Sequence, residues 1–137
     1  PKALEADGIV LGAPVHYASA AGQASCAYDR LFVMSNGAFA NKLGAAVVSC
    51  RRGGASAAFD RLNKYFTICN MTVVGSQYWN QVHGLTLEDV RKDEEGLQTM
   101  RTLAQNMAWL LKSVKAADRS NIKKTIYEER IATHFIS

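Results

Sequence analysis

Cysteine, proline and long apolar runs are all scarce in this sequence of 137 residues. Its three cysteines are isolated from one another, and none of them forms a Cys-x-x-Cys pair: Cys26, Cys50 and Cys69. An odd number of isolated cysteines argues against a disulfide framework and against a zinc site. We therefore expect no metal ligands here, and we expect each cysteine to act as a small buried hydrophobic residue.

The sequence also lacks the features of a membrane or secreted protein. No apolar stretch approaches the ~18 residues that indicate a transmembrane helix. The first residues, PKALE, lead into no apolar segment of a signal peptide. These absences predict a cytoplasmic protein without a membrane partner. The net charge of +4 comes largely from basic residues after position 111. Nucleic-acid binding is the weaker interpretation, because no aromatic residues alternate with these charges in a known reading motif.

Apolar runs and helical periodicity alternate along the chain. Three apolar runs predict strands over residues 6–14, 43–49 and 71–75. Helical spacing predicts helices over residues 23–34, from Ser56 to Cys69, and from Asp93 to Ala117. Ser56 is the expected N-cap of the second helix. Thr86 and Asp89 have the spacing of a capping box. The order β-α-β-α-β-α is typical of a parallel sheet covered by helices. We expect residues 1–119 to form the domain and residues 120–137 a C-terminal tail, docked on the domain by Ile126, Tyr127, Ile131 and Phe135.

Each predicted strand is followed by a loop of distinctive composition. The three loops span residues 14–22, 50–55 and 76–84, and they are rich in small, aromatic and basic residues. In parallel α/β sheets, ligands bind beyond the carboxyl ends of the strands. The three loops are therefore expected to converge on one site, which suits a flat ligand.

Four motifs in this order resemble a known family. The first motif is ADGIVLGAPVHYASAAGQ followed by DRLF, and the next three are CRRGGASAAFDRLNKYF, VVGSQYWNQVHG and DEEGLQTMRTLAQNMAWLLK. Together they are similar to the C-terminal portion of the flavodoxin-like NAD(P)H-dependent FMN reductases. The resemblance covers about residues 6–115. It implies an α/β fold of the flavodoxin-like type, here an incomplete remnant of about three parallel strands with flanking helices.

The resemblance also implies a cofactor and a set of residues that contact it. The implied cofactors are FMN and, as the electron donor, NAD(P)H. Small residues allow the backbone to approach the flat isoalloxazine ring, and the flavin itself carries the redox chemistry, so no catalytic side chain is predicted. The residues expected to contact the cofactors are Pro14, Val15, His16, Tyr17, Ala18, Arg51, Arg52, Gly53, Gly54, Tyr78, Trp79 and His83. Without the resemblance, these loops would be interpreted as strand-to-helix turns with solvated arginines and packed aromatic residues.

The sequence departs from the family pattern in one large respect. Relatives bind the FMN phosphate with a Ser/Thr-rich loop after their first strand. That unit is expected before Ala6, so the chain is expected to be a fragment of a longer fold. The strand over residues 6–14 would then have an open edge, which favours a homo-oligomer.

Two functions follow from these expectations. The first is an FMN-dependent NAD(P)H oxidoreductase of the flavin or quinone reductase type, which passes electrons to an acceptor. The second is a flavin-free association module. A simple electron-carrying flavodoxin fits less well, because such proteins are usually acidic and this chain is basic.

Overall fold

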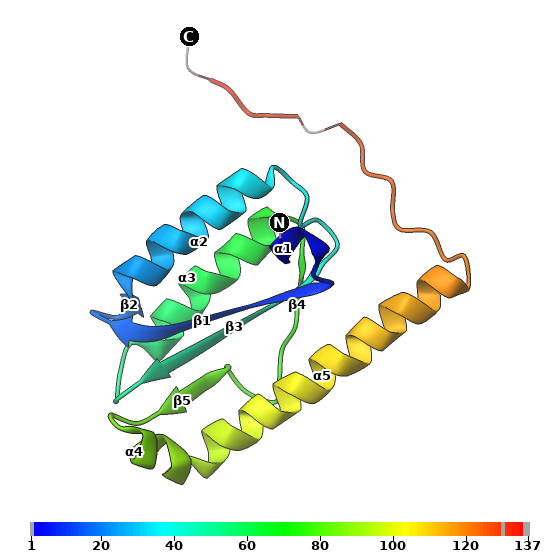
Figure 1. Cartoon of the computed structure of the whole chain (residues 1–137). Coiled ribbons are helices and arrows are strands. Elements are labelled where there is room, and N and C mark those ends of the chain that lie inside the picture. Colours follow the sequence, from blue (N-terminus) through cyan, green and yellow to red (C-terminus); the bar gives the residue numbers. More distant parts are fainter. Residues whose placement is uncertain (1, 130, 136–137) are drawn as a thin grey trace.

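The structure is a computed structural model that describes residues 2–129 and 131–135. Figure 1 shows a single sheet with helices packed on its two faces. The elements, in chain order, are α1 (Lys2–Glu5), β1 (Gly8–His16), β2 (Ser19–Ala20), α2 (Gly22–Ser35), β3 (Leu43–Cys50), α3 (Ala55–Ile68), β4 (Thr72–Val73), β5 (Gln81–His83), α4 (Leu87–Lys92) and α5 (Glu94–Arg119).

The sheet is parallel apart from one short strand. Strand β3 is central: it pairs in parallel with β1 on one side and with both β4 and β5 on the other. Strand β2 folds back antiparallel on the last residues of β1. The register aligns Pro14 with Ser49 and Ser49 with Val82, so β1, β3 and β5 reach the same edge of the sheet. The expected parallel α/β architecture is confirmed.

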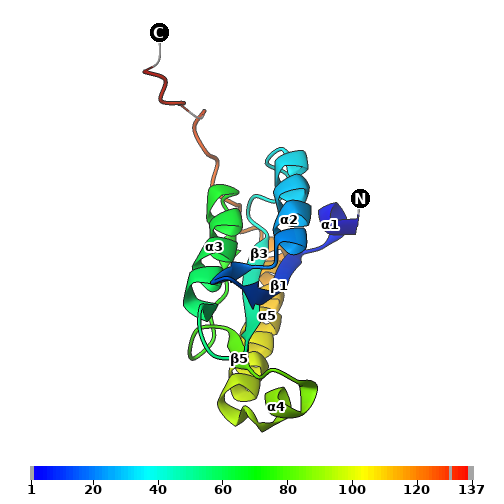
Figure 2. The same ribbon diagram turned by 90° about the vertical axis from the view of Figure 1, so that its left-hand side faces the viewer.

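The two faces of the sheet are covered by different helices, as Figures 1 and 2 show. Alternate residues of β3 point to opposite faces. Ala46, Val48 and Cys50 belong to the larger core cluster, which includes Leu62 and Phe66 of α3. On the other face, the smaller cluster of β3 side chains packs against α5. Burial on both faces explains why β3 is a continuous apolar run in the sequence.

The cysteines differ in their surroundings more than the sequence suggested. Cys50 is buried at the end of β3, as expected, and Cys69 is partly buried after α3. Cys26 is exposed, because it lies on the outer side of α2. The expectation of a buried hydrophobic residue is therefore wrong for Cys26.

The third strand differs from the expectation. Instead of one strand over residues 71–75, two short strands pair with different ends of β3. Residues 74–80 leave the sheet between them, and Ser76 and Asn80 join the two sides of this loop through a 2.7 Å hydrogen bond between their side chains. His83 consequently lies in strand β5, whereas the sequence placed it in a loop.

Strand β1 has one open edge. Residues 8–14 pair with β3 on one side, and within the described residues no strand lies on their other side. Val10 is 57% exposed there. It borders an apolar groove of about 410 Å³ between the sheet and α5, which Val47, Met100 and Met107 also line.

The chain beyond α5 runs away from the body of the molecule (Figures 1 and 2). The sequence suggested that Ile126, Tyr127, Ile131 and Phe135 dock this tail, and the structure corrects this for three of them. Ile126, Ile131 and Phe135 are almost fully exposed, so none of these side chains packs on the body. The Tyr127 hydroxyl does donate a hydrogen bond of 2.8 Å to Oδ1 of Asn41. Among residues 2–129 and 131–135, no helix combines the length and the hydropathy that a membrane span requires.

Candidate functional site

The first predicted loop is a tight hairpin at the end of β1. Val15 pairs with Ala20 and His16 with Ser19, so Tyr17 and Ala18 are the two central residues of the turn. Their φ angles are both positive, at 50° for Tyr17 and 59° for Ala18. Positive φ at both central positions is the backbone of a type I′ turn. Glycine and asparagine usually occupy such positions, and other residues are strained there. The turn holds the Tyr17 ring fully in solvent.

The second predicted loop touches the first. A Cβ atom added to Gly54 would lie 2.6 Å from Cα of Ala18 and 3.2 Å from Cγ1 of Val15, and Gly54 has φ of +84°. No other residue type fits this position without movement of the backbone. By contrast, a Cβ added to Gly53 would meet no atom within 4 Å. Gly53 and the neighbouring Arg51 and Arg52 are exposed beside the hairpin.

Two helices begin at this edge of the sheet without a capping side chain. The N-cap residues are Ala21 for α2 and Gly54 for α3, and neither makes a side-chain hydrogen bond to its helix. The sequence suggested Ser56 as the cap of α3, but Ser56 lies inside the helix. Uncapped helix N-termini present free N–H groups and a partial positive charge. Together with Arg51 and Arg52, they place positive charge beside the hairpin of β1 and β2.

His83 lies at the same edge on β5, opposite Cys50 in the register. Its backbone N–H donates a 2.7 Å hydrogen bond to Oδ2 of Asp93, and its Nδ1 lies 3.7 Å from the same oxygen. Asp93 also accepts a hydrogen bond from the backbone of Gly96 and so caps α5. Partial burial opposes ionisation of Asp93, but the N–H donors of Gly96 and His83 outweigh it, so the pKa of this carboxyl is lowered. Asp93 is therefore ionised at neutral pH, and its carboxylate holds the backbone N–H of His83 in place.

Tyr78 and Trp79 occupy a different position from the other predicted residues. They lie in the loop over residues 74–80, which leaves the sheet near the start of β3, after the pair of Gly44 with Val73, and rejoins it where Gln81 pairs with Val48. Their rings lie 5.0 Å apart and are about half exposed. Gln77 fixes this loop on α5, where its side chain bonds to Thr102 and Gln98. Tyr78 reaches the rest of the site by lining a cavity of about 40 Å³ with His83 and Asp93.

The structure thus brings the first two loops into direct contact and places His83 on the same sheet edge. Sequence reasoning missed the contribution of Asp93, which it assigned only to the start of a helix. It also missed the two uncapped helix ends, although the small residues before each helix are a readable signal. None of the twelve predicted residues is acidic. Within the described residues, no cluster of His, Cys, Asp and Glu has the geometry of a metal site.

Relatives in sequence are flavoproteins by name. The chain is 33% identical over 122 residues to an iron-sulfur flavoprotein of Methanocaldococcus jannaschii, a match that covers 83% of this chain and 63% of that protein. It is 30% identical over 118 residues to an iron-sulfur flavoprotein of Methanosarcina thermophila, with coverage of 83% and 61%. The chain therefore spans less than two thirds of the length of these relatives.

Solved structures show the same fold. A flavodoxin, WrbA-like protein of Agrobacterium tumefaciens superposes with a TM-score of 0.55 at 14% identity, over 75% of this chain and 69% of that one. Rubredoxin oxygen:oxidoreductase of Desulfovibrio gigas gives a TM-score of 0.59 at 19% identity, over 82% and 25%. The flavodoxin-like fold is thereby confirmed. A family model described as NADPH-dependent FMN reductase matches residues 1–86, which is more than half of the chain. The chain belongs to the NADPH-dependent FMN reductase family.

Proposed function

We propose that the chain forms the ring-binding part of an FMN-dependent NAD(P)H oxidoreductase. The observation that carries the proposal is the contact between the two loops, where Gly54 packs on Ala18 and Val15 at the carboxyl edge of the sheet. This contact leaves Gly53 open to solvent beside an exposed, strained Tyr17. Family membership supports FMN as the cofactor, and the open space around Gly53 supports the placement of a flat ring against this backbone.

The residues at this edge fit a flavin ring. When bound, FMN supplies the redox chemistry: it takes a hydride from NAD(P)H and passes the electrons to an acceptor. The uncapped N-termini of α2 and α3 offer N–H donors to the electron-rich pyrimidine edge of the ring. Arg51 and Arg52 add positive charge that suits either a reduced ring or a nicotinamide phosphate.

The remaining predicted residues orient and cover the ligand. Tyr17 is proposed to lie over one side of the ring, with Pro14, Val15, His16 and Ala18 forming the hairpin that carries it. His83 is held by Asp93 at the far end of the same edge. Tyr78, which lines a cavity with His83 and Asp93, is proposed to cover this end of the site, with Trp79 beside it. No residue of this set is assigned to the FMN phosphate, so the chain is proposed to recognise the ring.

The cysteines support the proposal that the protein acts in the cytoplasm. Cys26, Cys50 and Cys69 are all free thiols. Free thiols persist best in a reducing compartment.

A titration tests the proposal. The full chain is titrated with FMN and, separately, with riboflavin, while flavin fluorescence is followed, and NADH and NADPH oxidation is then measured with each. Because the proposal assigns contacts to the ring and none to the phosphate, the two flavins are expected to bind with similar dissociation constants. Gly53→Ala should weaken both at least tenfold, whereas Gly75→Ala, which also has open space around it, should not. A folded chain that binds neither flavin contradicts the proposal.

The open edge of β1 favours a second function, association of chains through this strand. Residues 8–14 present unpaired backbone groups beside an exposed Val10. Such an edge is a template for strand pairing. Light scattering separates the two functions. A stable oligomer that binds no flavin supports the association module, and a flavin-binding monomer refutes it.

A further inference from the structure

A groove of about 450 Å³ lies between α2 and α3, on the opposite face of the sheet from α5. We name it the α2–α3 groove; its lining residues are Asp29, Phe32, Val33, Gly37, Arg61, Lys64, Tyr65, Ile68 and Cys69. Its floor is apolar, and two of its side chains are unusually exposed for their type, Val33 at 80% and Ile68 at 76%. An exposed apolar groove with basic residues on its rim is typical of a docking site.

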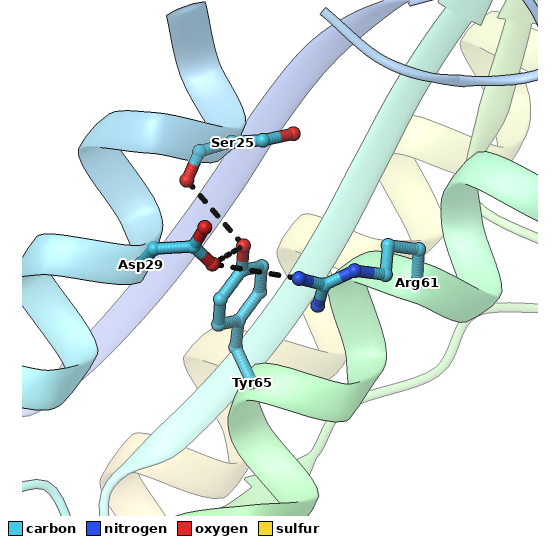
Figure 3. A network of polar contacts seen from close by, with 4 residues as sticks. All are labelled: Ser25, Asp29, Arg61 and Tyr65. Carbon is cyan, nitrogen blue, oxygen red and sulfur yellow. Dashed lines mark hydrogen bonds and ion pairs between the residues drawn. The ribbon is translucent and has the colours of Figure 1, made fainter. Parts of the chain in front are cut away.

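A polar network fixes the shape of this groove (Figure 3). The Tyr65 hydroxyl donates a hydrogen bond to Oδ1 of Asp29, and the Arg61 guanidinium lies 3.4 Å from the same oxygen. Arg61 also lies over the Tyr65 ring, 4.6 Å from its centroid, in a cation–π arrangement. Burial, together with the neighbouring carboxylate, raises the pKa of Tyr65 to about 12, so the network keeps its hydrogen bond at neutral pH. Asp29 and Arg61 are engaged with each other, so Lys64 is the rim charge that is offered to a ligand.

The C-terminal arm, residues 122–129 and 131–135, carries apolar side chains that match the apolar floor of the groove. Its apolar side chains are spread into solvent: Ile126, Ile131 and Phe135 are 93%, 91% and 92% exposed. Glu128 and Glu129 lie between them in the sequence. Lys123 and Lys124 precede these residues, so the arm as a whole is not acidic. The match is between apolar anchors and an apolar floor, with Glu128 and Glu129 as the groups that can pair with Lys64 on the rim.

The arm leaves its own chain beside the groove but runs away from it. Tyr127 is bonded to Asn41, whose N–H donates to the carbonyl of Asn70, next to the Cys69 end of the groove. From this anchor the arm continues outward, as Figures 1 and 2 show. Residues 122–135 contain no Gly, Pro, Asn or Asp. Those are the residues that make tight reversals. The sequence of the arm therefore favours an extended course toward another molecule over a turn back into its own groove.

We propose that the C-terminal arm docks in the α2–α3 groove of a second copy of the chain, and that the two copies exchange arms. In such a symmetric dimer each groove receives the arm of the other copy, so both apolar surfaces are covered. Eight extended residues after Tyr127 span about 26 Å. The groove between Cys69 and Arg61 follows roughly 12 Å of helix, so the arm is long enough to reach a neighbour and still fill it.

Disulfide trapping tests the pairing directly. Cys69 already lines the groove, so Ile131→Cys in a Cys26→Ser background places one partner thiol on the arm. Burial raises the pKa of the Cys69 thiol, and oxidation with diamide is therefore done under alkaline conditions. A non-reducing gel should show most of the protein at twice the 15.0 kDa chain mass. The band should be absent when Cys69 is also replaced by Ser.

Charge exchange provides a second, independent measurement without any flavin. Lys64→Glu alone, or Glu128→Lys with Glu129→Lys, should weaken the dimer at least tenfold by light scattering, and combining them should restore it to within about threefold. Glu88→Lys on α4 is the matched surface control. A cross-link within one chain, a chain that stays monomeric, or a dimer indifferent to these charges overturns the proposal. Neither measurement depends on flavin binding, so failure here is separate from failure of the proposed enzyme.

Discussion

Replacing Gly54 by alanine should disrupt the contact between the two site loops. Gly54 has φ of +84°, in the left-handed region. An L residue in that region is disfavoured by roughly 1–2 kcal/mol. The alanine Cβ would also lie 2.6 Å from Cα of Ala18, a backbone atom that cannot rotate away. Such overpacking costs typically about 1–3 kcal/mol.

One effect of the substitution opposes these losses. Alanine restricts the unfolded chain more than glycine does, which offsets about 0.4–1 kcal/mol. The net loss of unfolding free energy should therefore be about 3 kcal/mol. A loss of this size is well above the effect of an ordinary surface substitution.

Gly53→Ala is the matched control for this substitution. It adds the same methyl group one residue earlier, where φ is not positive and no atom lies within 4 Å. Its unfolding free energy should stay within about 0.5 kcal/mol of the parent chain. Flavin binding should weaken nonetheless, because the methyl group faces the proposed ring.

Urea unfolding followed by circular dichroism measures both variants. The expected pattern is loss of stability in Gly54→Ala and loss of flavin binding alone in Gly53→Ala. If Gly54→Ala is as stable as Gly53→Ala, the close approach of the two loops is not a property of the folded chain. The geometric argument for a shared site would then be refuted.

Three further predictions concern groups outside this contact. Asp93→Ala should lower the unfolding free energy by about 1 kcal/mol through loss of the α5 cap. Because folding lowers the pKa of Asp93, this deficit should shrink as the pH falls through that pKa, which urea titrations at several pH values would show. Folding raises the pKa of Tyr65 to about 12, so the stability of the parent chain should fall as the pH rises from about 10 to 12, and Tyr65→Phe should remove that part of the pH dependence. Gly44→Ala would place a Cβ against the buried ring of Phe66. It should therefore destabilise the chain by about 1–3 kcal/mol, and an unchanged thermal midpoint would contradict the described packing.

The sequence predicted the elements that are set by local pattern. The apolar run of β3 and the helical stripe of α3 indicated the correct element types, with boundaries displaced slightly. The capping box of Thr86 and Asp89 was also confirmed. These features depend on residues close in the chain, so periodicity and capping chemistry are sufficient to find them.

Long-range contacts were beyond the reach of the sequence. The third strand is split because β4 and β5 pair with different parts of β3. The residues around Gln81 carry no local pattern that predicts this second pairing. The need for glycine at position 54 comes from Ala18, which lies far earlier in the chain. The sequence correctly predicted a loop at Gly53 and Gly54. It did not predict that Gly54 packs on the other loop while Gly53 faces open space. The roles of the predicted site residues toward a cofactor stay predictions.

Because the third strand is divided into β4 and β5, the segment between them can differ in length without a change in the sheet. Strands β4 and β5 are each registered separately against β3, at Leu43–Gly44 and at Val48–Cys50. Residues inserted between them would lengthen the excursion and leave both registers as they are. The segment that carries Tyr78 and Trp79 is thus the place where such a scaffold can gain or lose a covering flap without refolding its sheet.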